Sequence, residues 1–230
     1  MSIASNLERI KNEIADACAR ANRDPGTVAL MAVSKMHPAE SVREAYETGQ
    51  RLFGENRVQE WQTKRASLTD LFPAAQTHLI GALQNNKTAK AAEIFDAIDT
   101  LDDLKTADRL NAAAASLNKT LRILIEVKLS PEDTKHGLAP EDLTTLLRAL
   151  APLTNLEPRG LMTVPPFDEN PETARPYFQH LRRLRDDNLA LCPTLTELSM
   201  GMSNDFAVAI EEGSTTVRIG TAIFGKRTYA

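Results

Sequence analysis

Short apolar segments alternate with helix-forming segments along this chain, and the alternation limits the folds that it can adopt. Eight segments have the composition of short strands, and they cover residues 27–33, 51–55, 77–81, 96–100, 121–129, 156–164, 196–200 and 215–220. A helical pattern follows each of the first seven, over residues 38–47, 56–66, 87–94, 102–117, 141–150, 171–187 and 204–212. Strands that alternate strictly with helices imply a parallel sheet.

Eight such units predict a closed (β/α)₈ TIM barrel of the α/β class. The 230 residues of the chain fall at the compact end of the size range of that fold. An open, doubly wound sheet is the alternative, but it usually has fewer strands, and neither GxGxxG nor GxxxxGK[ST] occurs here. Residues 3–20 have helical apolar spacing before the first strand, which adds an N-terminal helix. Because no linker or composition shift interrupts the pattern, we expect residues 1–230 to form a single domain.

Charge and composition narrow the classes of function. The net charge of −4 does not favour a nucleic-acid-binding protein. No apolar run approaches the roughly 18–20 residues that span a bilayer, and charges at Glu8 and Arg9 interrupt any signal-peptide core. The two cysteines, Cys18 and Cys192, form no CxxC pair and indicate no metal site. We therefore expect a cytoplasmic protein that binds neither nucleic acid nor membranes.

In a (β/α)₈ barrel, functional residues lie at the C-terminal ends of the strands. That rule selects a limited set of positions: Ser34, Lys35, Met36, His37, Gly54, Glu55, Asn56, Arg57, His78, Gly81, Lys128, Lys135, His136, Met162, Thr163, Met200, Gly201, Met202, Ser203, Asn204, Arg218, Gly220 and Thr221.

Ser34 and Lys35 follow the apolar first strand. A lysine in that place is partly desolvated, and desolvation lowers its pKa because it disfavours the charged form. A neutral amine is a nucleophile that can form a Schiff base with an aldehyde. The alternative is a rim lysine whose amine extends into water.

Two segments near the end of the chain have the features of a phosphate site. The sequence SMGMSND (199–205) leads from the seventh strand into a helix, where Ser203 or Asn204 is a suitable N-cap. The sequence RIGT (218–221) ends the eighth strand with a glycine beside a hydroxyl. The loops after strands 7 and 8 commonly bind phosphate in this fold, although an ordinary cap and turn would look the same. Together with Lys35, they suggest an aldehyde that carries a phosphate, such as pyridoxal phosphate (PLP).

Several longer segments then carry a resemblance that covers essentially the whole chain. They are AVSKMHP (32–38), FGENRVQE (53–60), HLIGALQNNK (78–87), KHGL (135–138), RGLMTV (159–164), LSMGMSNDF (198–206) and GSTTVRIGTAIFG (213–225). The sequence resembles the pyridoxal phosphate homeostasis protein family, the single-domain relatives of the alanine racemase N-terminal barrel.

The resemblance implies a PLP site and assigns residues to it. Lys35 would hold the cofactor as a Schiff base, and Ser203, Gly220 and Thr221 would hold its phosphate. Arg218 would face the pyridine nitrogen.

Two further residues are assigned less specifically by the resemblance. Asn56 is a candidate for a polar contact near the ring or its 3-hydroxyl. His78 would lie either against the cofactor or as a buried, hydrogen-bonded histidine of the barrel. No metal ligand and no catalytic residue is implied.

An arginine at the ring nitrogen has a chemical consequence. Guanidinium stays protonated, so it donates a hydrogen bond and leaves the nitrogen unprotonated. The ring is then a poor electron sink, which disfavours transaminase-like chemistry. The alternative for Arg218 is a strand-end arginine in a surface ion pair.

The family implies a non-catalytic protein of intracellular PLP (vitamin B6) homeostasis and supply, for which apo PLP-dependent enzymes are candidate partners. The alternative is a PLP-dependent amino-acid racemase of narrow or weak activity, and a pure interaction scaffold is a third hypothesis. Racemisation needs an acid or base on each face of the intermediate, and Lys35 supplies one at most. Tyr46 and Tyr177 fall in predicted helices, Tyr229 lies in the tail, and we expect no second domain to supply another tyrosine.

Overall fold

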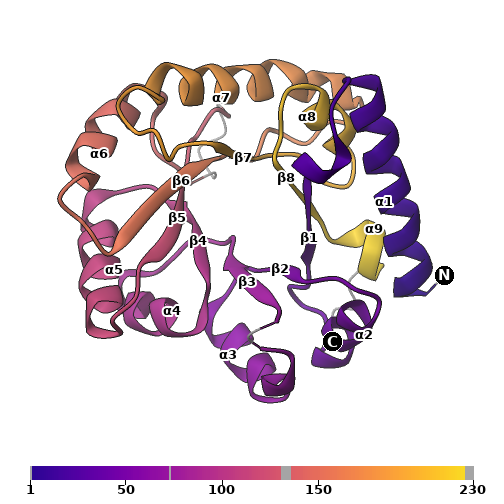
Figure 1. Ribbon diagram of the computed structural model, residues 1–230, viewed down its shortest axis with the longest axis horizontal. Coiled ribbons are helices and arrows are strands. Elements are labelled where there is room, and N and C mark those ends of the chain that lie inside the picture. Colours follow the sequence, from indigo (N-terminus) through magenta and orange to yellow (C-terminus); the bar gives the residue numbers. More distant parts are fainter. Residues whose placement is uncertain (1, 73, 131–135, 226–230) are drawn as a thin grey trace.

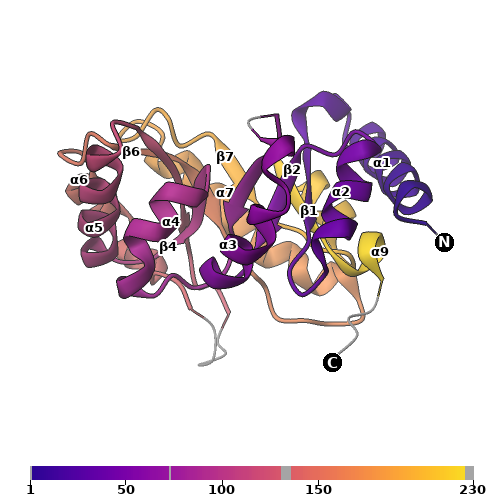
Figure 2. The ribbon, with the colours of Figure 1, turned by 90° about the horizontal axis from the view of Figure 1, so that it is seen from below.

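The eight predicted strands form one closed barrel in the computed structural model, which describes residues 2–72, 74–130 and 136–225. Lys135 and Tyr229 lie outside these described residues. Each strand pairs in parallel with its neighbours in the sequence, and β1 pairs with β8 to close the ring. Helices surround the strands, as Figures 1 and 2 show. The predicted (β/α)₈ fold is confirmed.

The bounds of the elements follow the predicted alternation. Strands β1 to β8 span Ala29–Val33, Leu52–Glu55, Gln76–Leu79, Ala97–Leu101, Leu121–Glu126, Leu156–Met162, Glu197–Ser199 and Thr216–Ile219. Helices α1 to α9 span Ile3–Arg20, Ala39–Glu47, Val58–Ala66, Thr88–Ile94, Leu104–Ser116, Leu143–Leu150, Arg175–Asn188, Phe206–Glu211 and Thr221–Phe224.

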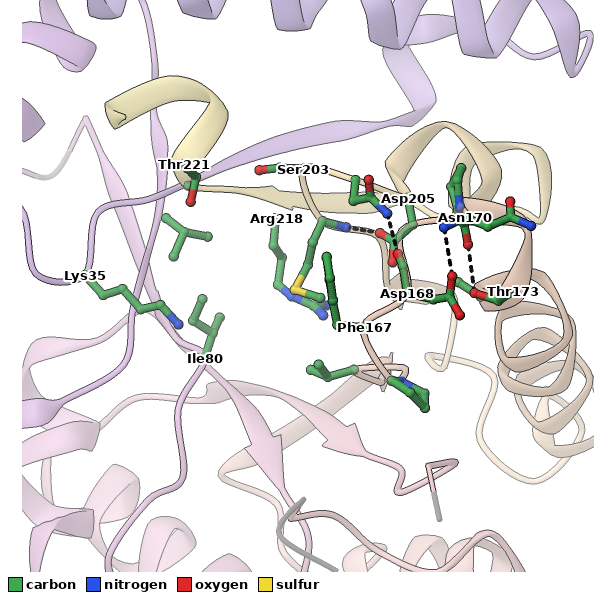
Figure 3. A pocket seen from close by; sticks show the side chains of 18 of the residues that line it. Lys35, Ile80, Phe167, Asp168, Asn170, Thr173, Ser203, Asp205, Arg218 and Thr221 are labelled. Atoms are coloured by element: carbon green, nitrogen blue, oxygen red, sulfur yellow. Dashed lines mark hydrogen bonds between the residues drawn. The ribbon is translucent and has the colours of Figure 1, made fainter. Parts of the chain in front are cut away.

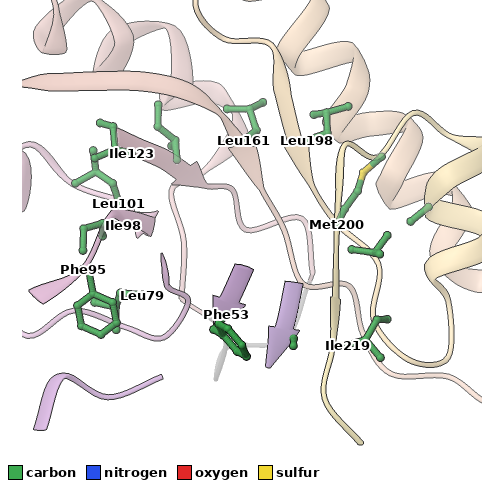
Figure 4. Packing of buried hydrophobic residues seen from close by; sticks show 14 of the residues in the cluster. Phe53, Leu79, Phe95, Ile98, Leu101, Ile123, Leu161, Leu198, Met200 and Ile219 are labelled. Atoms are coloured by element: carbon green, nitrogen blue, oxygen red, sulfur yellow. The ribbon is translucent and has the colours of Figure 1, made fainter. Parts of the chain in front are cut away.

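The main apolar core lies between the strands and the helices. Phe53, Leu79 and Ile98 from the strands belong to one buried cluster (Figure 4). The same cluster includes Trp61 of α3 and Leu110 of α5. Successive strand side chains point to opposite faces. The residues that alternate with these apolar ones therefore point into the barrel.

The interior face of the barrel is consequently polar, and its side chains are closely packed. It carries His78, Asp99 and Arg218, all buried. It also carries Gly54, where a Cβ would lie 2.8 Å from the sulfur of Met31. The barrel thus has charged groups directly below the ends of its strands.

The predicted N-terminal helix is α1, which packs beside α8 and α9 (Figure 1). Its buried face includes Leu7 and Ile10. The Asn6 side chain donates to the carbonyl of Ile223 at 2.9 Å, and Arg9 donates to the carbonyl of Ala222 at 3.1 Å. Helix α1 therefore holds the segment that follows β8.

Several local predictions differ from the structure. Helix α3 begins at Val58, two residues later than predicted, and β6 ends at Met162 rather than residue 164. The fifth strand ends at Glu126 rather than residue 129, and Val127 makes only an isolated bridge with Leu138. The segment after β8, expected as a tail, forms the short helix α9. Helix α8 begins at Phe206, two residues later than predicted.

Gly160 permits the close approach of β6 to β7, because a Cβ there would overlap the carbonyl oxygen of Glu197. We expect Gly160→Ala to lower the free energy of unfolding by about 1–3 kcal/mol, the usual cost of overpacking a tight site. Urea denaturation measures it. Gly26→Ala is the control, because Gly26 is exposed in the short 3₁₀ helix Pro25–Thr27 and the atoms nearest to a Cβ there belong to the flexible carboxylate of Asp24. Equal stability of the two variants would contradict this account.

Candidate functional site

A cavity of about 520 Å³ opens at the C-terminal ends of the strands. All six residues predicted for the site line it: Lys35, Asn56, Ser203, Arg218, Gly220 and Thr221. Figure 3 shows the labelled side chains of Lys35, Ser203, Arg218 and Thr221 around a common space. The folding of the barrel thus brings together residues that are up to 186 positions apart in the sequence.

The pairing of β1 with β8 places Lys35 beside the end of the last strand. Ala32 pairs with Ile219, and the two strands end together at the cavity. A Cβ on Gly220 would lie 3.2 Å from the carbonyl oxygen of Val33, closer than most such contacts. Glycine therefore lets the backbone after β8 approach the backbone that carries Lys35. Lys35 itself is half-buried and lines the cavity.

Arg218 is buried and has a fixed orientation. One terminal nitrogen donates to the carbonyl and hydroxyl oxygens of Ser199 at 2.7 and 2.8 Å, and the other donates to the carbonyl of Thr163 at 2.8 Å. These bonds use three of the five guanidinium N–H groups. The alternative prediction of a surface ion pair for Arg218 is wrong, because the side chain lies inside the barrel and donates to neutral oxygens.

Three carboxylates compensate the charge of Arg218 without direct hydrogen bonds to it. Burial lowers the pKa of Arg218, and the charges of Asp99, Glu126 and Asp205 oppose that effect. Burial likewise raises the pKa of Asp205, against the hydrogen bond from the Met202 N–H and the charge of Arg218. The charge of the buried Arg218 is therefore partly offset by the negative charges of these three carboxylates.

Of the two alternatives predicted for His78, the structure shows a buried, hydrogen-bonded histidine of the barrel. Its Nδ1 lies 3.2 Å from Oδ2 of Asp99 on the neighbouring strand. It is not among the side chains that line the large cavity. Burial alone would lower the pKa of His78, but the charge and hydrogen bond of Asp99 outweigh it and raise the pKa.

The loop before α8 differs from its predicted capping. Neither Ser203 nor Asn204 is the N-cap; that position belongs to Asp205. The Asp205 carboxylate accepts from the Met202 N–H at 2.6 Å, and the Asn204 side chain donates to the carbonyl of Asp168 at 2.8 Å. The Ser203 hydroxyl thus stands in a loop that its two flanking residues hold in place.

The sequence interpretation missed one wall of the cavity. The segment after β6 supplies Val164, Pro166, Phe167, Asp168 and Asn170. Phe167 is 78% exposed, the largest exposed fraction among the exposed large apolar side chains of the described residues. The position of this segment after a strand end could have indicated that it lines the cavity. Its sequence, TVPPFDENP, has no charge pattern that distinguishes it from an ordinary connecting loop.

Asn56 presents an unsatisfied polar atom. Its Oδ1 is buried and has no hydrogen-bond partner among the described residues. Buried polar atoms are nearly always hydrogen-bonded in folded proteins. An unpaired oxygen on the cavity wall therefore suits a ligand that donates a hydrogen bond.

A smaller cavity of about 210 Å³ shares Ile80 and Val164 with the large one. It contains Glu126, Lys128 and His136. Burial raises the pKa of Glu126 to about 6, with the charge of Arg218 acting in the opposite direction. The barrel opening thus holds a second polar compartment beside the one that contains Lys35.

Residues 5–228 match the alanine racemase N-terminal domain family. Two pyridoxal phosphate homeostasis proteins are 44% and 45% identical, from Aquifex aeolicus (all of both chains) and Pseudomonas aeruginosa (99% of this chain, 97% of the relative). This chain belongs to the pyridoxal phosphate homeostasis protein family. The resemblance inferred from the sequence is confirmed.

Solved structures of the family and of its distant relatives agree with this assignment. PipY of Synechococcus elongatus with PLP bound is 40% identical over 97% of this chain and all of PipY, with a TM-score of 0.87. An alanine racemase of Clostridium difficile is 15% identical and superposes with a TM-score of 0.71, over 99% of this chain and 57% of the racemase. The racemase shares the barrel fold with the homeostasis protein family.

Two other properties concern the described part of the chain. It contains no group of three or more His, Cys, Asp or Glu side chains that could hold a metal ion. None of its helices has both the length and the apolar character needed to cross a membrane.

The pair of His78 with Asp99 generates a prediction about titration. In the wild-type protein the pKa of His78 should lie above its ordinary value of about 6.5, and in Asp99→Asn it should fall below that value, because burial remains without its compensation. NMR titration of the imidazole measures both. The pair stabilises the fold fully below the pKa of the unfolded histidine, and this stabilisation is lost as the pH rises through the higher folded-state pKa.

Asp70→Asn, which removes an exposed carboxylate paired with Arg43, is the control and should leave the His78 titration unchanged. An unchanged His78 pKa in Asp99→Asn would show that this carboxylate does not determine it.

Proposed function

We propose that this protein binds PLP in the large cavity, covalently through Lys35, and acts in cytoplasmic PLP homeostasis and supply without robust catalytic activity. The observation that carries the proposal is the convergence of Lys35 with Ser203, Gly220, Thr221 and the buried Arg218 on one cavity. The PLP-bound structure of PipY and the names of the curated relatives support it. We also propose that residues 1–230 act as a single domain and that apo PLP-dependent enzymes receive the cofactor.

The residues present fit this cofactor. A cavity of about 520 Å³ lies within the range typical of small-molecule sites, roughly 300–1,000 Å³. The missing side chain of Gly220 leaves room against the backbone of Val33, and the buried Oδ1 of Asn56 lacks a donor. Arg218 retains two N–H groups beyond its bonds to Ser199 and Thr163. When bound, PLP supplies an aldehyde that reacts with a neutral amine.

Each residue has a distinct role in this proposal. Lys35 supplies the amine, and the hydroxyls of Ser203 and Thr221 with the backbone at Gly220 bind the phosphate. Arg218 donates a hydrogen bond to the ring nitrogen and keeps it unprotonated, since guanidinium does not give up its proton. Asn56 accepts a hydrogen bond near the ring.

The positions of two tyrosines support a carrier rather than a racemase. Tyr46 lies in α2 and Tyr177 in α7, and neither lines the cavity. Within the described chain, neither residue therefore offers a second acid or base opposite Lys35. A screen of amino acids for turnover tests this reading. Robust racemisation that Lys35→Ala abolishes would favour the racemase.

The decisive prediction concerns the covalent anchor. Wild-type protein incubated with PLP and reduced with borohydride should carry the adduct on Lys35. In Lys35→Ala, the peptide that contains position 35 should carry none. Absorption spectra and peptide mass spectrometry measure it. Lys90→Ala removes an exposed lysine paired with Glu93 and should behave as wild type. Absence of any adduct in the wild type would refute the proposal.

The phosphate contacts can be tested separately from the anchor. We expect Ser203→Ala and Thr221→Val each to raise the Kd for PLP by about 10- to 150-fold, because a hydrogen bond to a charged group is worth about 1.5–3 kcal/mol. The Kd for pyridoxal, which has no phosphate, should change less than about 2-fold, as neither hydroxyl then has a charged partner. Fluorescence titration measures both ligands.

Thr173→Val, on the wall supplied by the segment after β6, is the matched control and should affect neither ligand. Equal losses for PLP and pyridoxal would place the two hydroxyls away from the phosphate.

A further inference from the structure

A buried lysine on α3 contacts the segment that carries Lys35. Lys64 is 8% exposed, and its ammonium lies 2.9 Å from the carbonyl oxygen of Ser34. It also donates to Oε1 of Glu55 at 2.6 Å and to Oε1 of Glu60 at 3.0 Å. These three acceptors match the three protons of an ammonium group. We call Ser34, Glu55, Glu60 and Lys64 the Lys64 network.

The network holds the residue before Lys35 through its side chain as well as its carbonyl. Ser34 is fully buried, and its hydroxyl donates to Oε1 of Glu55 at 2.7 Å. Its N–H donates to the carbonyl of Gly54 on the neighbouring strand at 3.1 Å. Every polar group of Ser34 near the strand end therefore has a buried partner or one in the sheet.

The network holds the residue after Lys35 as well. The N–H of Met36 donates to Oε1 of Glu60 at 2.5 Å, the same oxygen that accepts from Lys64. Met36 has a φ of 61°, in the left-handed region that residues with a side chain rarely adopt. Such a conformation persists only where the surroundings hold it. Glu60 supplies one of the contacts that do so.

The charges of the network make it costly to rearrange. Burial raises the pKa of Glu55, and Lys64 and Ser34 reduce that rise. Burial also acts to raise the pKa of Glu60, but the hydrogen bonds from Met36 and Lys64 outweigh it and lower the pKa. Removing one partner of a buried ion pair leaves an uncompensated charge. The ammonium of Lys64 thus binds the carbonyl of Ser34, which precedes Lys35, and the carboxylate of Glu60, which in turn accepts from the N–H of Met36, the residue after Lys35.

We propose that Lys64 is a positioning residue for Lys35. Through Ser34 on one side and Glu60 with Met36 on the other, it fixes the backbone from which the Lys35 amine enters the cavity. This inference rests on the proposed function, because it assumes that Lys35 reacts with PLP. Lys64 itself does not line the large cavity, so it acts through Lys35 and not on the cofactor.

The first test replaces the common partner. Lys64→Met retains most of the side-chain volume but removes the charge and the three donors. We expect the rate constant of PLP attachment, followed by absorbance, to fall by 10-fold or more, on the order of the loss of one charge-assisted hydrogen bond. Lys119→Met is the control, because Lys119 is half-buried and, like Lys64, donates to a backbone carbonyl, that of Phe95, away from Lys35. It should attach PLP at the wild-type rate.

The second test leaves the Lys64 ammonium paired with Glu55, so it remains informative if Lys64→Met does not fold. Glu60→Ala removes the acceptor of the Met36 N–H, whereas Glu60→Gln keeps an oxygen there. We expect about 5-fold slower attachment in Glu60→Ala, the value of one ordinary hydrogen bond, and rescue to within about 2-fold in Glu60→Gln.

A readout without PLP separates this inference from the proposed function. In the protein without cofactor, hydrogen exchange of the Met36 amide should be about 5-fold faster in Glu60→Ala than in wild type or Glu60→Gln. If wild type forms no Lys35 adduct, the proposed function fails, while the exchange result still reports on the network. If folded Lys64→Met and Glu60→Ala attach PLP at the wild-type rate with wild-type exchange at Met36, the positioning role is overturned.

Discussion

The pairing of β1 with β8 is the constraint on which the proposed site depends. It closes the sheet, and it sets Ala32 opposite Ile219, so that the two strands end at the same place. The segments that follow them, with Lys35 on one and Gly220 and Thr221 on the other, therefore line one cavity. Helix α1 supports this junction from outside through its bonds to the carbonyls of α9. Residues so distant in the sequence line one cavity only because the barrel is closed.

Closure also forces charged groups into the interior. The strand residues that alternate with the apolar core point inward, and they include Arg218, His78 and Asp99. Arg218 is held by neutral oxygens of Ser199 and Thr163, with carboxylates close enough to compensate its charge. A guanidinium fixed in this way can donate a hydrogen bond to a ligand without moving. The polar residues inside the barrel thus fix the orientation of Arg218, whereas the apolar residues between the strands and the helices stabilise the fold.

For Lys35, too, the group proposed to react and the groups that orient it are separate. In the proposed function its amine forms the covalent bond, and the groups that direct it lie behind the strand ends, out of the cavity. Lys64, Glu55 and Glu60 are part of the packing between β1, β2 and α3, yet their hydrogen bonds end on the two residues that flank Lys35. In the proposed function, these bonds would fix the position from which the amine meets the aldehyde. The chain shares its barrel fold with an alanine racemase that is only 15% identical, and a shared fold does not by itself imply a shared activity.

The sequence by itself determined the alternation of strands and helices, because apolar runs and helical spacing are local patterns, and hence it predicted the barrel. Lys35 and the residues after β7 and β8 followed from the rule that strand ends meet. The start of α8 was misplaced: the helix begins after Asp205 with no side-chain cap, and the Asp205 carboxylate instead accepts from the Met202 N–H in the preceding loop. Short-range preference for capping residues does not predict such a bond. The wall after β6 and the Lys64 network were decided only by the tertiary structure. Lys64 looks like any solvent-facing helix residue until the packing of α3 against β1 and β2 buries its ammonium beside Ser34 and Glu55.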